Sequence, residues 1–304
     1  MDTEGLDVGL FQAFAAVARN RSLTSAAKTL GVSQPTLTRR LQALEGALGA
    51  TLVVRTPTGI HLTEAGLALV PPAMKLLATV DEARASVSGS ATDLGGAVSV
   101  GSGGSVGAHV LPDLLARFLR AHPGVSVRIR EGMPETLEHD LARGELDLAV
   151  ITLPVHRKDL VIQKVYREDY VLAVPSDHPL AEATSPVKIA SLADEPLLVV
   201  PISVMTRVAL EAMEARGKKP RIVATADNFI TLRRMVARGA GVAFCPRLMT
   251  LGAVAGVRYV ELEHGGTERL VAVAHHGSST LSRAATALRD AIVTGFGERA
   301  KAKR

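Results

Sequence analysis

The sequence predicts an α+β and α/β fold: an N-terminal winged helix-turn-helix, then a linker helix, then a two-lobed α/β domain. Three observations predict it. Residues 21–41 resemble two short helices joined by a tight turn at Gly31. Residues 50–63 hold two extended segments on either side of a Pro/Gly turn. From Ala97 onward, strand-like and helix-like segments alternate.

The helix-turn-helix is predicted from its end signals as well as from its periodicity. A first helix is expected over Val8 to Arg19, because its apolar residues recur at helical spacing. Ser22 and Ser33 then stand where N-caps are needed, and Gly31 suits the end of the second helix. Pro35 falls in the first turn of the third helix. The apolar side chains that this third helix should turn to the core are Leu37, Leu41, Leu44 and Leu48.

The opposite face of the third helix is polar and basic. Gln and Arg side chains can make paired hydrogen bonds to adenine and guanine edges in the DNA major groove. Residues 19–55 carry six basic residues and one acid, which is a net charge of +5. The net charge of the whole chain is also +5, so the charges of the remaining residues nearly cancel. Attraction to phosphate is therefore concentrated at the N-terminus. An ordinary helical hairpin with a solvated basic face is the alternative. The candidate DNA-contacting residues are Ser33, Gln34, Pro35, Thr36, Thr38, Arg39, Arg40 and, in the wing, Arg55.

A β-hairpin wing and a long helix follow. Residues 50–55 and 60–63 flank the turn Thr56-Pro57-Thr58-Gly59, which predicts the hairpin. Glu64 to Val87 is predicted to be helical, and Pro71-Pro72 should kink or weaken that helix. Its apolar residues alternate three and four apart, the spacing of a seam between two helices, which favours dimerisation over packing on its own chain. The seam residues are Leu67, Val70, Met74 and Leu77.

Composition excludes several classes of protein. The 304 residues suffice for about two domains, and no apolar run approaches the ~18 residues of a membrane helix. The acidic start Met1-Asp2-Thr3-Glu4 is unlike a signal peptide, and the single cysteine, Cys245, fits a reducing compartment, so we expect a cytoplasmic protein with no membrane partner. Cys245 lies in an apolar strand, which favours a buried structural thiol over a sensor.

The region after residue 94 is predicted to form a mostly parallel sheet covered by helices. Two lobes would be joined by crossing segments near Val165 and Glu263. Ligands of such folds bind at the carboxyl ends of strands, between the lobes. The predicted strands are 97–100, 125–129, 146–151, 170–174, 197–201, 221–226, 242–245 and 270–274, and the helices are 111–121, 135–143, 207–216, 231–238 and 279–296.

Taken together, these residues resemble the LysR-type transcriptional regulators. The most specific part runs from Leu10 to Gly66, and the rest of the chain matches in pattern. The motifs are Ser22-Leu23-Thr24-x-Ala26-Ala27, Val32-Ser33-Gln34-Pro35, Leu44-Glu45-x-x-Leu48-Gly49, Leu52-x-x-Arg55 and Leu62-Thr63-x-Ala65-Gly66, followed by Leu111-Pro112, Gly144-Glu145-Leu146-Asp147, Asp177-His178-Pro179-Leu180 and Val236-x-x-Gly239-x-Gly241-Val242-Ala243.

The resemblance implies a winged helix-turn-helix over residues 1–63, a dimerising linker helix and hinge over 64–93, and a periplasmic-binding-protein-like effector domain over 94–304. Lobe I would comprise about 94–165 and 266–304, and lobe II about 166–265. It also implies a homodimer or homotetramer that binds double-stranded promoter DNA, responds to a small-molecule effector and admits RNA polymerase as a partner. By position, Gln34, Pro35, Thr38 and Arg39 would contact bases, and Arg55 a phosphate.

The effector site is expected at the strand ends. Hydroxyls and N–H groups of the turn Gly101–Gly107 could hold a carboxylate or other anion. Read alone, that turn also resembles an imperfect dinucleotide fingerprint, so an α/β enzyme or a solute-binding module is the alternative. No nucleophile–base pair is apparent, and His264, His275 and His276 lack further ligands, so we expect no catalysis, cofactor or metal. The resemblance implies that effector contacts lie in the turn Gly101–Gly107, after the second and third strands, and across the cleft, although each residue could instead be an ordinary loop residue. The effector candidates are Ser102, Gly103, Ser105, Met133, Pro134, Thr152, Pro201, Ile202, Asn228 and Phe229.

Overall fold

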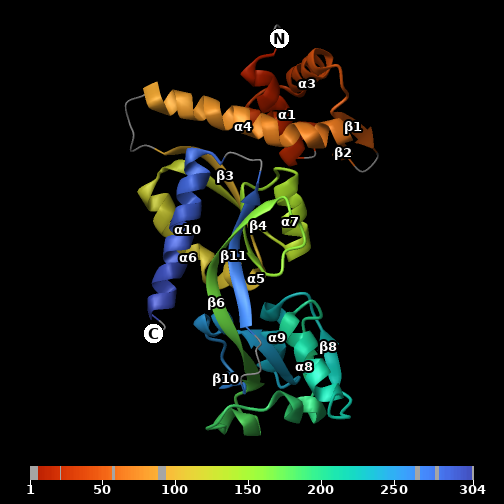
Figure 1. The fold of residues 1–304 in the computed structure, drawn as a ribbon, viewed down its shortest axis with the longest axis vertical. Coiled ribbons are helices and arrows are strands. Elements are labelled where there is room, and N and C mark those ends of the chain that lie inside the picture. The colour runs from red at the N-terminus through yellow and green to blue at the C-terminus, as the bar shows by residue number, and fades with distance from the viewer. Residues whose placement is uncertain are drawn as a thin grey trace.

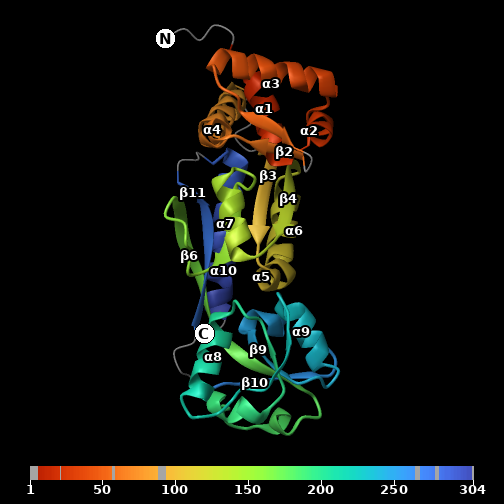
Figure 2. The same cartoon turned by 90° about the vertical axis from the view of Figure 1, so that its right-hand side faces the viewer.

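A computed structural model of the chain describes residues 6–20, 22–56, 59–87, 94–263, 268–277 and 281–302. The helix-turn-helix lies at one end of an elongated molecule, and α4 (Glu64–Val87) crosses between it and the first of two α/β lobes (Figure 1). Figure 2 shows the second lobe at the far end. Among the described helices, none is long and apolar enough to span a bilayer.

The helix-turn-helix is confirmed, with the predicted caps. It consists of α1 (Val8–Asn20), α2 (Leu23–Leu30) and α3 (Gln34–Leu48). The Ser22 and Ser33 hydroxyls accept hydrogen bonds from the backbone N–H groups of Ser25 and Thr36, and Gly31 is left-handed at φ 64°. Of the predicted core side chains on α3, Leu37, Leu41 and Leu44 are buried. The expectation for Leu48 was wrong: it is 38 % exposed, because α3 ends there, beyond the surface that α1 covers.

The hairpin wing is formed by β1 (Val53–Thr56) and β2 (Gly59–Leu62), which pair antiparallel. Residues 57–58, the predicted tip of the turn, lie outside the described chain. The Glu45 carboxylate of α3 accepts hydrogen bonds from Leu52 N at 2.7 Å and Val53 N at 3.2 Å, so the wing is tied to α3.

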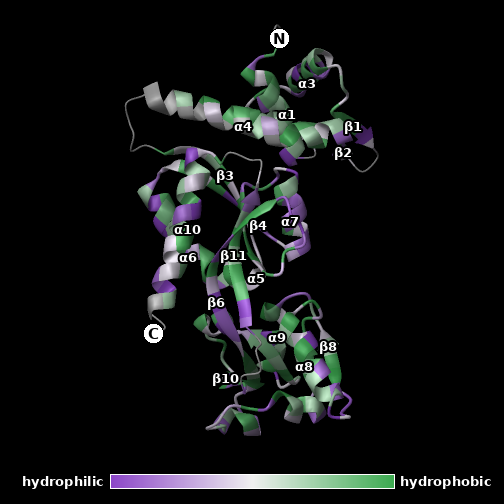
Figure 3. Ribbon diagram, in the orientation of Figure 1, coloured by the Kyte–Doolittle hydropathy of each residue, from purple (hydrophilic) through white to green (hydrophobic). Residues whose placement is uncertain are grey.

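The linker helix α4 has the predicted bounds and continues through Pro71-Pro72 without a break. Val70 and Ala73, on either side of the prolines, are buried against the helix-turn-helix, and this packing offsets the lost backbone hydrogen bonds. The predicted seam is divided. Val70 and Met74 pack on this chain, whereas Leu67 is 42 % exposed. Figure 3 shows hydrophobic residues along α4 as well as through the helix-turn-helix.

The remaining strands form one nine-stranded sheet in the described chain, in the order β4-β3-β5-β11-β6-β9-β7-β8, with β10 beside β6. The expectation of a mostly parallel sheet was wrong. Pairs within each lobe are parallel, but the long crossing strands β6 and β11 run antiparallel to each other and to their neighbours β5, β9 and β10. Their strand character was missed over residues 160–169 and 257–261, where charged residues interrupt the apolar pattern.

The elements of the two lobes are otherwise close to the predicted ones. The first crossing falls on β6, which pairs with β11 up to Asp169 and with β9 from Tyr170. The second was expected near Glu263, and residues 264–267 lie outside the described chain. The bounds are β3 Gly95–Ser102, α5 Gly104–His109, α6 Leu111–Ala121, β4 Gly124–Glu131, α7 Pro134–Ala142, β5 Leu148–Thr152, β6 Leu160–Pro175, β7 Leu197–Val199, α8 Val204–Glu214, β8 Ile222–Thr225, α9 Phe229–Val236, β9 Val242–Pro246, β10 Val257–Glu261, β11 Glu268–His276 and α10 Arg283–Ala302, with 3-10 turns η1 Pro179–Glu182, η2 Ile189–Asp194 and η3 Arg247–Leu251.

Candidate nucleic-acid interface and effector edge

The predicted DNA-contacting residues gather at the start of α3 and along its outer face. Ser33, Gln34, Pro35 and Arg39 are exposed, and Thr36 and Thr38 are partly exposed. The Ser33 and Thr36 hydroxyls hydrogen-bond to each other at 2.8 Å, and Thr24 of α2 donates to Gln34 Oε1 at 3.4 Å. Thr24 was not among the predicted contacts; its exposed place beside Gln34 adds it to this surface. The face offers the amide and guanidinium groups that suit base edges.

Two of the predicted basic residues, Arg40 and Arg55, lie away from the group at the start of α3. The Arg40 guanidinium lies near Gly9 at the start of α1, 3.8 Å from where a Cβ on that glycine would be. Arg55 is exposed on the wing, paired in register with Ile60.

At the lobe I edge, the structure brings Ser102, Gly103 and Met133 together. Ser102 ends β3 and is fully buried, and its backbone oxygen accepts a hydrogen bond from Gly132 N at 3.2 Å. Its hydroxyl donates to the backbone oxygen of Gly103 at 3.1 Å. Met133 is the N-cap residue of α7 and Pro134 its first residue, while Thr152 ends the neighbouring strand β5.

At the lobe II edge, Pro201 and Ile202 follow β7, and both are exposed, Ile202 at 54 %. Ala226 N donates to Val199 O at 3.1 Å, which sets the chain leading to Asn228 beside them. Asn228 caps α9 by accepting from Thr231 N at 2.9 Å, and Phe229 is half-buried among lobe II side chains. The amide oxygen of Asn228 is therefore used by the fold.

The two edges meet at α5. An ideal Cβ on Gly104, the first residue of α5, would lie 4.0 Å from Ile230 Cδ1 in the first turn of α9. Figure 2 shows α5 at the lower end of lobe I, directly above α9. Gly103 and Ser105, the neighbours of Gly104 in the chain, thus belong to the segment that approaches the first turn of α9.

A buried polar cluster that the sequence did not predict adjoins α5. Arg269 of β11 donates from Nη2 to the Ser105 hydroxyl at 2.8 Å, and from Nε to Glu168 Oε1 of β6 at 2.8 Å. Ser105 was predicted as a ligand contact, yet its oxygen already accepts from this guanidinium. Burial, opposed in part by the Arg269 charge, raises the pKa of the adjoining Tyr170. The pairing joins residues 101 positions apart, so no local pattern signalled it.

A second inter-lobe contact involves a histidine. His109 ends α5, and its ring lies against Gly252 of lobe II, where a Cβ would come within 2.5 Å of Cε1. Arg233 of α9 donates to the backbone oxygens of Met249 and Gly252 at the same place. Burial, and then the charge of Arg233, lower the pKa of His109. The fold therefore favours the neutral form of His109.

Cys245 is fully buried in β9, as expected of a structural thiol, and burial raises its pKa to about 12. Within the described residues, no group of three or more His, Cys, Asp or Glu side chains could hold a metal ion.

Comparison with known proteins identifies both halves of the chain. Residues 8–67 match the bacterial regulatory helix-turn-helix family of the LysR type, and residues 91–297 match the LysR substrate binding domain. A probable hydrogen peroxide-inducible genes activator of Mycobacterium avium is 36 % identical over 78 % of this chain and 76 % of its own length. The regulator IlvR of Caulobacter vibrioides is 32 % identical over 84 % of this chain and 88 % of its own.

Solved structures of LysR-type regulators have the same fold as this chain. A full-length OxyR variant from Pseudomonas aeruginosa is 26 % identical, with a TM-score of 0.75 and 94 % of each chain covered. CbnR bound to its target DNA shares the fold, at 22 % identity and a TM-score of 0.58, over 96 % of this chain and all of that one. The relatives with curated names are transcriptional regulators. The chain belongs to the LysR family of transcriptional regulators, with an N-terminal DNA-binding helix-turn-helix and a C-terminal effector-binding domain.

Proposed function

We propose that this regulator recognises promoter DNA through the outer face of α3. The observation that carries the proposal is the exposure of Gln34 and Arg39 on a helix whose other face is buried. Ser33, Pro35, Thr36 and Thr38 shape the surface around them, and Arg40 and Arg55 neutralise phosphates on either side. We expect no catalysis, and a location in the cytoplasm.

The DNA-binding form is proposed to be a homodimer or homotetramer. One recognition helix with a short wing reads few base pairs, so a paired arrangement would supply the selectivity. The proposed contact between copies lies on the side of α4 that carries Leu67, a predicted seam residue that is 42 % exposed. Leu67→Glu should lower the association constant measured by sedimentation, without changing the helix content.

The effector is proposed to be a small molecule that binds where the lobe edges meet, at α5. We propose as effector contacts the same residues that the sequence predicted. They are Ser102, Gly103, Ser105, Met133, Pro134 and Thr152 from lobe I, and Pro201, Ile202, Asn228 and Phe229 from lobe II. An anionic ligand is proposed from the hydroxyls and N–H groups of the turn Gly101–Gly107, because the Arg269 charge beside Ser105 is already paired with Glu168. Peroxide, the inducer in the names of several relatives, is disfavoured as a direct reactant, because the lone cysteine is buried and protonated.

The experiment that tests DNA recognition is fluorescence anisotropy on duplexes from upstream of the chain's own coding region. We expect tighter binding than to a shuffled duplex, with affinity that falls steeply as salt rises. Equal affinity for both duplexes at every salt concentration would refute the proposal. A thermal-shift screen of small carboxylates, aromatics and amino acids would then seek the effector, since a ligand of the native state raises the melting temperature.

A further inference from the structure

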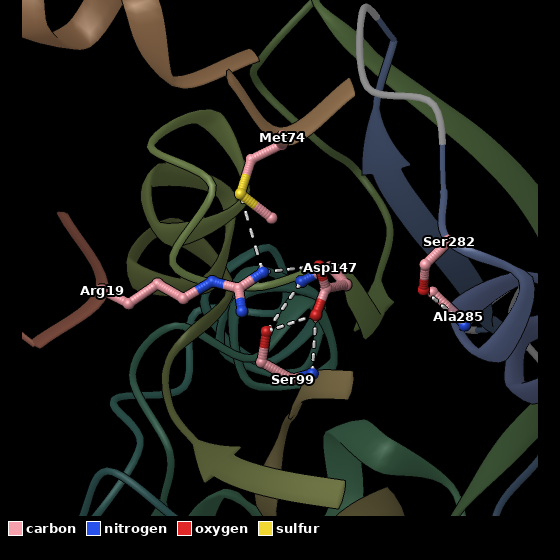
Figure 4. A network of polar contacts seen from close by, with 6 residues as sticks. All are labelled: Arg19, Met74, Ser99, Asp147, Ser282 and Ala285. Atoms are coloured by element: carbon pink, nitrogen blue, oxygen red, sulfur yellow. Dashed lines mark hydrogen bonds and ion pairs between the residues drawn. The ribbon is translucent and has the colours of Figure 1, made fainter. Parts of the chain in front are cut away.

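The helix-turn-helix is held to the effector domain by a polar contact. Arg19, in the last turn of α1, donates from Nη2 to Asp147 Oδ1 at 3.2 Å (Figure 4). The same nitrogen lies 3.7 Å from the sulfur of Met74 in α4. The Arg19 and Asp147 side chains are 26 % and 15 % exposed. One guanidinium thus touches the helix-turn-helix, the linker helix and the effector domain.

Asp147 is itself fixed by the effector domain. Its Oδ2 accepts hydrogen bonds from the backbone N–H and the hydroxyl of Ser99, each at 2.7 Å. The backbone N–H of Asp147 donates to Ser99 Oγ at 3.1 Å. The carboxylate that meets Arg19 therefore moves with β3 and with the turn before β5.

An apolar contact adjoins the ion pair. Gly144, in the same turn, has a φ of +65°, and a Cβ there would lie 2.4 Å from Val70 Cγ1 and 3.7 Å from Met74 Cγ. Glycine is needed both for this backbone conformation and for the close approach of α4. We call Arg19, Met74, Ser99, Gly144 and Asp147 the latch contact.

The elements behind the latch contact lead to the proposed effector edge. Strand β3 holds Ser99 and ends at Ser102, and β5 begins directly after Asp147 and ends at Thr152. Helix α7 begins at Pro134 and ends two residues before Gly144. A rearrangement of the strand ends at the effector edge would thus reach the latch contact through short, rigid elements.

We propose that the latch contact sets the orientation of the helix-turn-helix on the effector domain and makes it depend on the effector edge. Its regulatory part rests on the proposed function. The outer face of α3 stays exposed, so the latch contact orients the helix-turn-helix and does not block its proposed DNA-binding surface. A preset orientation lowers the ordering cost of binding a paired site. Arg19 and Asp147 are positioning residues for DNA recognition.

The orientation can be measured as a distance in the full-length protein. Thr29→Cys in α2 and Ala116→Cys in α6 place spin labels on exposed sites of the two units, and buried Cys245 stays unlabelled. Labelled chains are diluted into unlabelled ones, so that pulsed electron resonance reads the intrachain pair. We expect Arg19→Gln, Asp147→Asn and Ser99→Ala to broaden the distribution. Lys28→Gln, which removes a cation from the same unit, should leave it unchanged. An unchanged distribution in Arg19→Gln and Asp147→Asn would overturn the proposal.

DNA affinity gives an independent reading. Both Arg19→Gln and Asp147→Asn should weaken binding to the preferred upstream duplex about two- to fivefold, the range for a partly exposed ion pair. The double variant should lose no more than either single one, and Arg19→Lys should retain part of the affinity. A general charge effect would instead move the two single variants in opposite directions, since one loses a positive and the other a negative charge. Opposite or multiplying effects would overturn the latch. If the wild-type protein binds no upstream duplex more tightly than a shuffled one, the proposed function fails. The distance measurement then tests by itself whether the latch contact orients the helix-turn-helix.

Discussion

Glu168 and Arg269 form a buried ion pair between the two strands that cross from one lobe to the other. Glu168 is 1 % exposed and Arg269 7 %, and Nε donates to Oε1 at 2.8 Å. The second Glu168 oxygen accepts from Leu248 N of η3 at 2.7 Å, and Arg269 also donates to Ser105 of α5. The pair therefore connects both lobes to the crossing strands.

Removing one partner of this pair should be costly. Arg269→Met leaves the Glu168 carboxylate buried without its counter-charge, and we expect the free energy of unfolding to fall by ~3–5 kcal/mol. Glu168→Gln combined with Arg269→Met should be less destabilised than Arg269→Met alone, because no unpaired charge remains. Urea unfolding followed by circular dichroism measures both. A loss below ~1 kcal/mol for Arg269→Met would mean that water reaches the carboxylate.

Acid should loosen the contact between α5 and lobe II. Burial and Arg233 hold the pKa of His109 below its usual 6.5, so the unfolded chain takes up the proton first as the pH falls. The stability that depends on neutral His109 is complete above pH 6.5 and is lost as the pH falls from 6.5 through the lowered pKa. We expect the melting temperature of His109→Gln to depend less on pH between about 7.5 and 5.5 than that of the wild type. His156→Gln, at an exposed site, is the control and should keep the wild-type slope.

Arg39 and Arg55 should differ in what they contribute to DNA binding. Arg39→Ala should relax the preference at one base position and cost about 1–3 kcal/mol on the preferred duplex. Arg55→Ala should weaken all duplexes alike and reduce the salt slope by about one. Titrations of single-substituted duplexes at several salt concentrations separate these effects. If Arg39→Ala weakens all sequences equally, Arg39 contacts a phosphate instead.

Cys245 should resist oxidation in the folded protein. The thiolate is the reactive form, and burial raises the pKa of this thiol to about 12. We expect millimolar hydrogen peroxide to leave the native thiol intact for hours, and urea-unfolded protein to lose it quickly. Thiol counting after quenching measures the loss in each state. Rapid loss of the thiol in the native state would contradict this prediction and would support peroxide sensing through Cys245.

The parts of the fold that were predictable rest on signals within a few residues. Ser22, Gly31 and Ser33 mark helix ends by their own backbone chemistry, so the helix-turn-helix could be placed from the sequence. The exposed face of α3 followed from the burial of Leu37 and Leu41 on the other side.

What was missed depends on contacts between distant residues. Arg19 and Asp147 are 128 positions apart, and neither has a neighbour that indicates its partner. The long antiparallel strands at the crossing were missed because alternating charges there look like surface loops. The hydroxyl of Ser105 looked free for a ligand, since nothing local shows that Arg269 binds it.

The central claim is that paired copies of α3 read DNA of defined sequence. DNase I footprinting of the wild-type protein on the region upstream of its coding sequence tests it most directly. We expect two protected half-sites on one face of the duplex, spaced by one helical turn of about 10–10.5 bp or a multiple of it. The protection should shift or vanish when a half-site is changed. Weak protection spread evenly over the duplex, whatever its sequence, would contradict sequence-specific binding by paired copies of α3.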